Sequence, residues 1–254
     1  MLNFKAGLLF QVSSPKKLLK RNRELQAKGR DSEICFVLGN GPSLKNVNLD
    51  LLAPYPCFTT NLFYTNNNGN GFSSRYHVFV DPAYGTDDFL PYVRQVHSEK
   101  RAEYVILNKN FKKRMQQEGL LDDRTYFVDI SYISHGNVVR CDMSRAMSGS
   151  LNVIPVAIEC AIYMGYKKIY LLGCDFNSYV NGKYEHFNDP DGYEDVMSRR
   201  EVVGELIRCA LVHNQHYALD EYSRARGSKI VNLTEGSLID AYERDDLANI
   251  VQEG

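Results

Sequence analysis

Short apolar runs alternate with longer mixed segments along most of the chain. The apolar runs are rich in β-branched and aromatic residues, which is typical of buried strands. They cover residues 33–38, 57–61, 76–80, 103–107, 125–130, 168–173 and 229–233. Helical patterns cover stretches near 87–97 and 109–118, residues 148–165 and the long polar region 196–226. This alternation predicts an α/β fold, a Rossmann-like, mostly parallel sheet with helices on both faces.

The segment 148–165 has the pattern of a buried helix. Its apolar side chains, among them Ile154 and Ile158, recur at helical spacing. Ser148 is a suitable N-cap for this helix, since its hydroxyl can accept a hydrogen bond from a free backbone N–H. Pro155 falls inside the segment and predicts a kink.

Length and charge narrow the classes of protein. The chain has 254 residues, with 30 Lys and Arg against 31 Asp and Glu, and this balance argues against a nucleic-acid binder. We expect a basic N-terminal extension at 1–32, one domain with a lid-like loop at 33–240, and a C-terminal tail at 241–254. Residues 14–30 predict a solvated basic helix, or alternatively a patch that touches anionic membrane lipid.

Cysteine usage and the N-terminus predict a cytoplasmic protein. The six cysteines form no CxxC pair, which favours buried free thiols in a reducing compartment. No apolar run approaches the roughly 18 residues that cross a bilayer. The first residues carry a short apolar stretch without a small-residue cleavage site, so they do not predict a secretion signal.

Polar residues follow the predicted strands at their carboxyl ends, where ligands bind in open parallel sheets. A glycine-rich turn lets a phosphate approach the backbone, although this one lacks the GxGxxG spacing and the P-loop lysine. Arg145, just ahead of the predicted helix start, could clamp a phosphate or carboxylate, or make a surface ion pair. The strand-end residues are Gly39, Asn40, Gly41, Pro42, Ser43, Asn61, Asp81, Asp175 and Phe176.

Three histidines are candidates for a general base, whose pKa should lie near neutrality. His186 lies in the polar loop 177–195, which has the composition of a lid. His213 and His216 share one face of the long helix. Two histidines at this spacing could also hold a metal ion, but the sequence offers no third ligand, so we expect no metal and no cofactor.

Four segments in order resemble a known family. FVLGNGPSL, TNLFY, RAMSG before an apolar helix, and GYKKIYLLGCDF are similar to motifs of the bacterial sialyltransferases of glycosyltransferase family 42. They also resemble the wider MptE-like group, which includes 6-hydroxymethylpterin diphosphokinases. The resemblance covers residues 33–240. It implies a modified Rossmann domain with one nucleotide site, a CMP-sugar donor, inversion at the anomeric carbon and no metal.

The resemblance also implies roles for individual residues. The family's nucleotide loop is matched by Asn40, Gly41 and Ser43. Its donor-binding Asn is matched by Asn61, and its donor-holding motif is matched by Arg145, Ser148 and Gly149. Two tyrosine hydroxyls stabilise the leaving phosphate in that family. Tyr179 and Tyr184 match them if one gap is allowed, whereas Asn177 replaces the first without a gap.

Two departures keep alternatives open. The family has Asn where this chain has Asp81, and an anionic side chain there would repel a carboxylate-bearing donor. His186 is favoured as the base, while His213 and His216 lie closer to the family's position for it.

We therefore expect an inverting glycosyltransferase of bacterial surface glycan synthesis, with a nucleotide-sugar donor and a glycan or glycolipid acceptor. The alternatives are a Mg²⁺-dependent diphosphokinase, with Asp81 and Asp175 as metal ligands, and a non-catalytic nucleotide-binding module. The oligomeric state stays open, with a homo-oligomer as one alternative.

Overall fold

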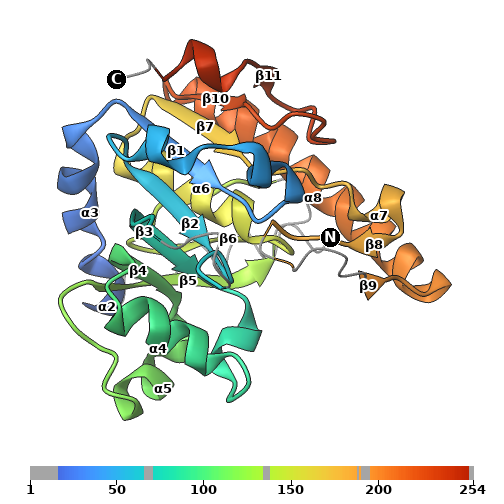
Figure 1. Ribbon diagram of the computed structural model, residues 1–254. Helices are drawn as coiled ribbons and strands as arrows, with labels where there is room; N and C mark the ends of the chain where they lie inside the picture. The colour runs from blue at the N-terminus through green and yellow to red at the C-terminus, as the bar shows by residue number, and fades with distance from the viewer. Residues whose placement is uncertain (1–16, 66–70, 134–137, 188, 190–194, 252–254) are drawn as a thin grey trace, which may run out of the picture.

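The computed structural model describes residues 17–65, 71–133, 138–187, 189 and 195–251. Its centre is a sheet in the order β11-β10-β7-β1-β2-β3-β4-β5-β6, in which every neighbouring pair is parallel (Figure 1). Every predicted strand is present, so the α/β class is confirmed. The strands are β1 (Ile34–Leu38), β2 (Cys57–Thr60), β3 (Ser74–Phe79), β4 (Ala102–Asn108), β5 (Thr125–Ile133), β6 (Ala146–Gly149), β7 (Lys168–Leu172), β10 (Lys229–Asn232) and β11 (Glu243–Arg244).

Alternate side chains of the strands enter two separate cores, because successive residues of a strand point to opposite faces. On β1, Cys35 and Val37 pack with helices α3 (Arg23–Lys28), α6 (Val153–Met164) and α8 (Arg199–Ala225). Phe36 and Leu38 pack in the other core with α4 (Leu90–Ser98) and α5 (Lys112–Gln117). Helices thus cover both faces of the sheet, as the sequence pattern predicts.

The predicted helix start at Ser148 is wrong. Ser148 is buried in strand β6, and α6 begins only at Val153. Asn152 is the N-cap, since its side-chain oxygen accepts a hydrogen bond of 2.8 Å from the Ile154 backbone N–H. Pro155 stands in the first turn of α6, where a backbone N–H has no partner within the helix, so the reason for a kink is removed.

The described part of the basic extension is attached to the domain. Helices α2 (Lys17–Lys20) and α3 bury Leu19 and Leu25. Between them, the Asn22 side-chain amide donates to the backbone oxygens of Phe127 at 2.7 Å and Met143 at 2.6 Å. Residues 17–28 are therefore part of the folded domain, whereas the sequence predicted a solvated helix there.

The chain beyond residue 240 also belongs to the fold. Strand β11 pairs with β10 at the edge of the sheet, beyond the predicted domain boundary. All six cysteines are buried free thiols, as expected. Across the described ranges, no helix is both long and apolar enough to cross a bilayer. Predictions for residues 1–16, and for 188 and 190–194 in the lid, lie outside the described residues.

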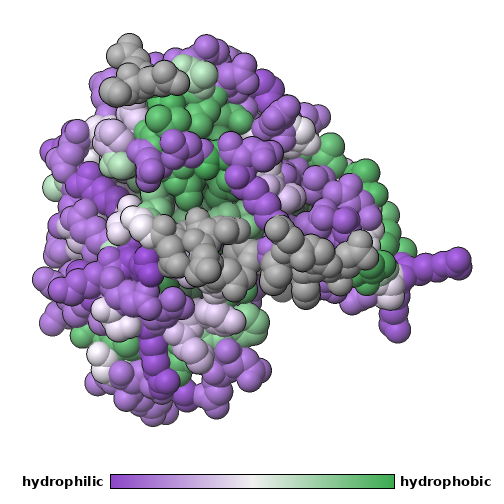
Figure 2. Space-filling model, in the orientation of Figure 1, coloured by the Kyte–Doolittle hydropathy of each residue, from purple (hydrophilic) through white to green (hydrophobic). Residues whose placement is uncertain are grey.

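One side of the molecule carries a projection of short elements. Helix α7 (Ser178–Asn181) and the antiparallel strands β8 (Lys183–Tyr184) and β9 (Asp195–Val196) stand beside the first turns of α8 (Figure 1). Figure 2 shows apolar side chains gathered there on the surface. The exposed ones include Val180, Val196, Val203, Leu206 and Ile207.

Candidate functional site

A cavity of about 170 Å³ lies at the carboxyl ends of β1, β2 and β7. The strand order reverses at β1. Strands β2 to β6 follow one another on one side of β1, and β7, β10 and β11 follow one another on its other side. Ligands of open α/β sheets bind at such a switch point. The described lining residues are Gly39–Pro42, Thr60, Asn61, Asn152–Ile154, Gly173–Ser178, Tyr184–His186, Arg208, His216 and Ile239.

Glycines let the loop after β1 and the loop after β7 come close together. The Gly39 N–H donates to the Leu172 oxygen, and the Gly41 N–H donates to the Gly173 oxygen, both at 2.8 Å. A Cβ atom on Gly39 would lie 2.3 Å from the Gly173 oxygen, and one on Gly41 would lie 1.9 Å from a carboxylate oxygen of Asp175. The glycines are therefore required by the contact between two loops, in addition to any role toward a phosphate.

Ser43 and Asp175 are engaged with each other. The Ser43 backbone N–H and hydroxyl donate to the two Asp175 carboxylate oxygens at 3.0 and 2.6 Å. Burial raises the pKa of the Asp175 carboxyl, and the two hydrogen bonds oppose that rise. Asp175 lines the cavity, but Ser43 does not; it lines a neighbouring cavity of about 740 Å³.

Two asparagines that line the cavity have buried, unpaired side-chain oxygens. The Asn40 amide donates to the Thr60 backbone oxygen at 3.1 Å, while its side-chain oxygen is buried without a partner in the described part of the chain. Asn61 adopts φ 50°, a left-handed conformation that Asn tolerates, and its side-chain oxygen is likewise buried and unpaired there. Buried acceptors without partners are costly, so each of these two oxygens has an unmet need for a hydrogen-bond donor.

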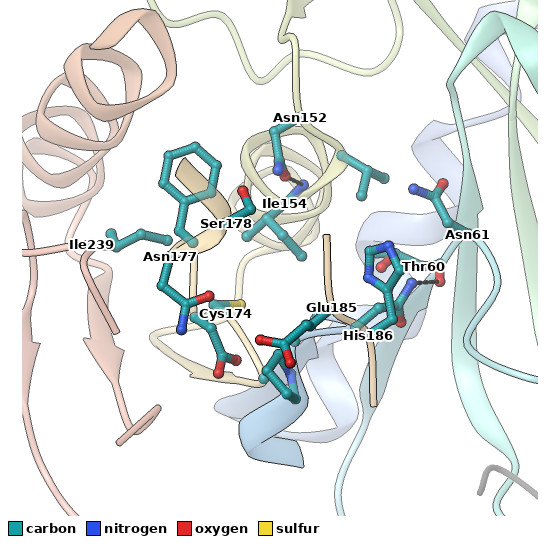
Figure 3. A pocket seen from close by; sticks show the side chains of 18 of the residues that line it. Thr60, Asn61, Asn152, Ile154, Cys174, Asn177, Ser178, Glu185, His186 and Ile239 are labelled. Carbon is teal, nitrogen blue, oxygen red and sulfur yellow. Dashed lines mark hydrogen bonds between the residues drawn. The ribbon is translucent and has the colours of Figure 1, made fainter. Parts of the chain in front are cut away.

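The segment after α7 forms part of the cavity wall through Tyr184, Glu185 and His186. Figure 3 shows His186 close to Asn61, with Asn177 on the opposite side. Phe187 anchors the segment, because its backbone N–H donates to the Asn40 backbone oxygen at 2.9 Å and its buried ring packs in the core. His186 itself is exposed and lines the cavity.

The other two histidines stand differently. His216 is fully buried, and its Nδ1 lies 2.8 Å from the Tyr242 hydroxyl. Burial lowers the pKa of His216 to about 3, so its imidazole is neutral at physiological pH. His213 is absent from the described lining and packs against the Phe176 ring at 5.1 Å, and burial lowers its pKa. Of the three, His186 has the exposure that a proton acceptor for an incoming hydroxyl needs.

Several predicted site residues lie outside the described lining. Arg145 is exposed and makes the alternative surface ion pair, 3.4 Å from Asp142. It precedes β6 at the far edge of the sheet, because the motif forms a strand there and not a helix start. Ser148 and Gly149 are buried in that strand.

Asp81 and Tyr179 are also absent from the described lining. The exposed Asp81 carboxylate caps a short 3-10 helix, η5 (Pro82–Gly85), by accepting from the Ala83 N–H at 2.9 Å. Tyr179 stands on α7, whereas Asn177, its alternative without an alignment gap, lines the cavity.

Arg208 and Asn152 line the cavity, although the sequence pattern did not lead us to either of them. Arg208 comes from the middle of α8, between Ile207 and Cys209, and belongs to no motif that marks a binding site. Asn152 could have been found as an alternative N-cap to Ser148, since Asn is equally favoured at that position. Among the residues described, no three His, Cys, Asp or Glu side chains form a group that could hold a metal ion.

No family model and no curated protein matches the sequence. Solved structures share the fold. The sialyltransferase CstII from Campylobacter jejuni, in complex with the substrate analogue CMP-3FNeuAc, is 15% identical with a TM-score of 0.54, over 88% of this chain and 90% of that one. The monofunctional α-2,3-sialyltransferase Cst-I from the same organism is 17% identical with a TM-score of 0.55, over 89% and 84%. A complex of CST-II with a trisaccharide acceptor and CMP has 15% identity and a TM-score of 0.53, over 87% and 89%.

Proposed function

We propose that the chain is a glycosyltransferase that moves a sugar from a nucleotide donor to an acceptor hydroxyl. The observation that carries this proposal is the pair of unpaired, buried oxygens of Asn40 and Asn61 at the switch point of the sheet. Such oxygens can accept hydrogen bonds from the amino group of a base or from ribose hydroxyls. The similar structures solved with CMP and CMP-3FNeuAc support a CMP-linked, sialic-acid-like donor.

The proposed reaction inverts the anomeric carbon. His186 accepts the proton of the acceptor hydroxyl, whose oxygen attacks the anomeric carbon from the side opposite the phosphate. The bond between the sugar and the phosphate oxygen breaks, and the nucleoside monophosphate leaves. Tyr184 donates a hydrogen bond to that phosphate, and the N-terminus of α6, where Asn152 and Val153 line the cavity, favours its negative charge. Because these donors stabilise the leaving group, we propose a metal-independent reaction.

We further propose an acceptor and a cellular location. The acceptor is a glycan or glycolipid of a bacterial surface, and the reaction takes place in the cytoplasm. Leu19 and Leu25 are buried, whereas Lys17, Lys20 and Arg23 are exposed. Contact of residues 14–30 with a membrane would therefore be electrostatic, through basic side chains and anionic lipid. A homo-oligomer is a further proposal.

A thermal-shift panel of CMP, CDP, UDP, GDP, ATP with Mg²⁺, and a pterin tests the donor class. A ligand at a hundredfold excess over its Kd stabilises by about 2.7 kcal/mol, which raises the melting temperature by roughly 5–10 °C for a protein of this size. We expect CMP to give the largest rise. A larger rise with ATP, Mg²⁺ and pterin would contradict the proposal in favour of a diphosphokinase. Transfer from CMP-sialic acid, measured with and without EDTA, then tests reaction and metal independence.

A further inference from the structure

Arg208 brings a permanent positive charge to the cavity. It is the single Lys or Arg among the described lining residues, and its side chain is 30% exposed. Its guanidinium carbon lies 5.5 Å from the centre of the Phe176 ring, and one terminal nitrogen donates to the Leu151 oxygen at 3.4 Å. The side chain is therefore held over the loop that follows β7, at the edge of the site.

Glu205 fixes the orientation of this guanidinium. Arg208 Nε donates to one Glu205 oxygen at 2.7 Å, and Arg208 Nη2 donates to the other. The Glu205 side chain is only 3% exposed, and the Ser178 hydroxyl donates to it at 2.9 Å. Burial opposes ionisation of Glu205, yet the hydrogen bonds and charge of Arg208 hold its pKa below the ordinary value. The carboxylate and the arginine therefore form one rigid unit.

The unit leaves donors for a ligand. A guanidinium has five N–H groups. Glu205 takes the Nε–H and one on Nη2, and Leu151 takes one on Nη1. No other hydrogen bond of Arg208 is found within the described ranges, so one N–H on each terminal nitrogen is left. Two N–H groups on neighbouring nitrogens match two oxygens of a phosphate or carboxylate.

A second donor lies within electrostatic range. Burial raises the pKa of the Tyr184 hydroxyl and the Glu205 carboxylate raises it further, while the charge of Arg208 opposes that rise, so the hydroxyl keeps its proton and can donate it. Both side chains line the same cavity, Tyr184 from β8 and Arg208 from α8. A phosphate has oxygens for both donors, whereas a neutral sugar ring gains nothing from the charge.

We infer that Arg208, oriented by Glu205 and Ser178, binds the phosphate of the nucleotide beside Tyr184. This inference rests on the proposed function. It assigns to α8 the positive charge that the resemblance had placed at Arg145. The carboxylate of a sialic-acid-like sugar offers the same anionic oxygens, so the experiment must separate the two sources.

Binding of CMP, cytidine and intact CMP-sialic acid to Arg208→Met separates them. We expect the Kd of CMP to rise about 10–100-fold, as for loss of a charge-assisted hydrogen bond, and that of cytidine to change less than about twofold. Arg200→Met, an exposed arginine at the start of α8, should bind all three like the wild type. Arg208→Lys, which keeps the charge without the fork, should fall between.

A double variant, Arg208→Met with Glu205→Gln, removes the carboxylate that the single variant leaves unpaired. If the loss of CMP binding comes from missing N–H donors, the double variant shows it too; recovery of wild-type affinity would overturn the inference. Unchanged CMP binding in a folded Arg208→Met protein, with weaker binding of CMP-sialic acid only, would overturn the phosphate assignment in favour of the carboxylate. A wild-type protein that binds no nucleotide would overturn the proposed function as well, whereas the other two outcomes leave it standing.

Discussion

At His186, exposure separates a role in catalysis from a role in folding. The side chain lines the cavity and is exposed, so its removal costs little packing. If it is the base, His186→Ala should lower kcat about 10²–10⁴-fold and leave the melting temperature within about 2 °C. Transfer assays and thermal unfolding of the same preparation measure both.

His213→Ala is the matched comparison for that experiment. This imidazole packs against Phe176 and is absent from the described lining, so we expect turnover per folded molecule close to that of the wild type. A His186→Ala protein that keeps more than about a tenth of the wild-type kcat would contradict the assignment, because that exceeds what loss of a general base allows.

The burial of His216 makes stability depend on pH. Its pKa is lowered to about 3 in the folded chain, whereas an unfolded chain protonates near the ordinary value of 6.5. The neutral imidazole therefore contributes fully to the free energy of unfolding above pH 6.5, and this contribution is lost as the pH falls toward 3. From about pH 8 to about pH 5, we expect the free energy of unfolding of the wild type, measured in urea, to fall by about 2 kcal/mol more than that of His216→Gln. If the free energy of unfolding changed with pH in the same way for the two proteins, His216 would not be held neutral in the folded chain.

Gly41 and Gly204 predict opposite effects of the same substitution. A Cβ on Gly41 would collide with Asp175 at 1.9 Å, whereas a Cβ on Gly204 meets nothing within 4 Å on helix α8. We expect Gly41→Ala to destabilise by about 1–3 kcal/mol. Gly204→Ala should stabilise by up to about 1 kcal/mol, since alanine favours a helix. Equal melting temperatures for the two variants would show that the loop after β1 has room to move.

At the scale of elements, helix α6 carries one buried acid in an apolar surface. Glu159 is fully buried and accepts from the Ser148 hydroxyl at 2.6 Å, and burial raises its pKa well above the usual value. The folded chain thus keeps a proton that the unfolded chain releases, and stability falls as the pH rises above about 4.5. Glu159→Gln should therefore melt higher than wild type at about pH 8, and the gap should shrink toward about pH 5. A gap independent of pH would mean that Glu159 is already ionised in the fold.

Elements with strong local patterns could be predicted from the sequence, and those fixed by tertiary pairing could not. Strand β7 is an apolar run between a turn and a glycine, and α8 has a capping box formed by Ser198 and Glu201. Strand β6 consists of Ala146–Gly149, four residues without a β-branched side chain, and β11 of two charged residues. Their strand conformation comes from pairing with β5 and β10, which no local pattern encodes.

The same distinction applies to the candidate site. Residues next to strand ends, such as Asn40 and Asn61, could be predicted because a parallel sheet fixes where its strands end. Arg208 and His216 reach the cavity from the middle of a helix with a mixed surface, so the face toward the site depends on how α8 packs. Arg145 was misplaced because its motif forms an edge strand.

On the scale of the whole molecule, residues beyond 240 complete the fold. The Tyr242 ring is buried and pairs with His216, and Arg244 donates to the backbone oxygens of Thr234 and Ile239, both at 3.0 Å. A chain ended after residue 240 should melt at least about 6 °C lower than wild type, or fail to fold, because loss of a buried aromatic side chain costs about 3–5 kcal/mol. A chain ended after residue 251 is the control, and we expect it to melt within about 2 °C of wild type. Similar melting for both would mean that β11 is dispensable.

The central position of β1 has a consequence for synthesis on the ribosome. Strand β1 pairs with β2, which follows soon after it, and with β7, which begins only at Lys168. A nascent chain that has not yet reached that point leaves one edge of β1 without its final neighbour, and open strand edges invite wrong pairing. The loops that contain Gly39 and Gly173 also meet only after β7 is made. No ligand of this cavity can therefore guide the early steps of folding, because the cavity does not exist until two thirds of the chain has emerged.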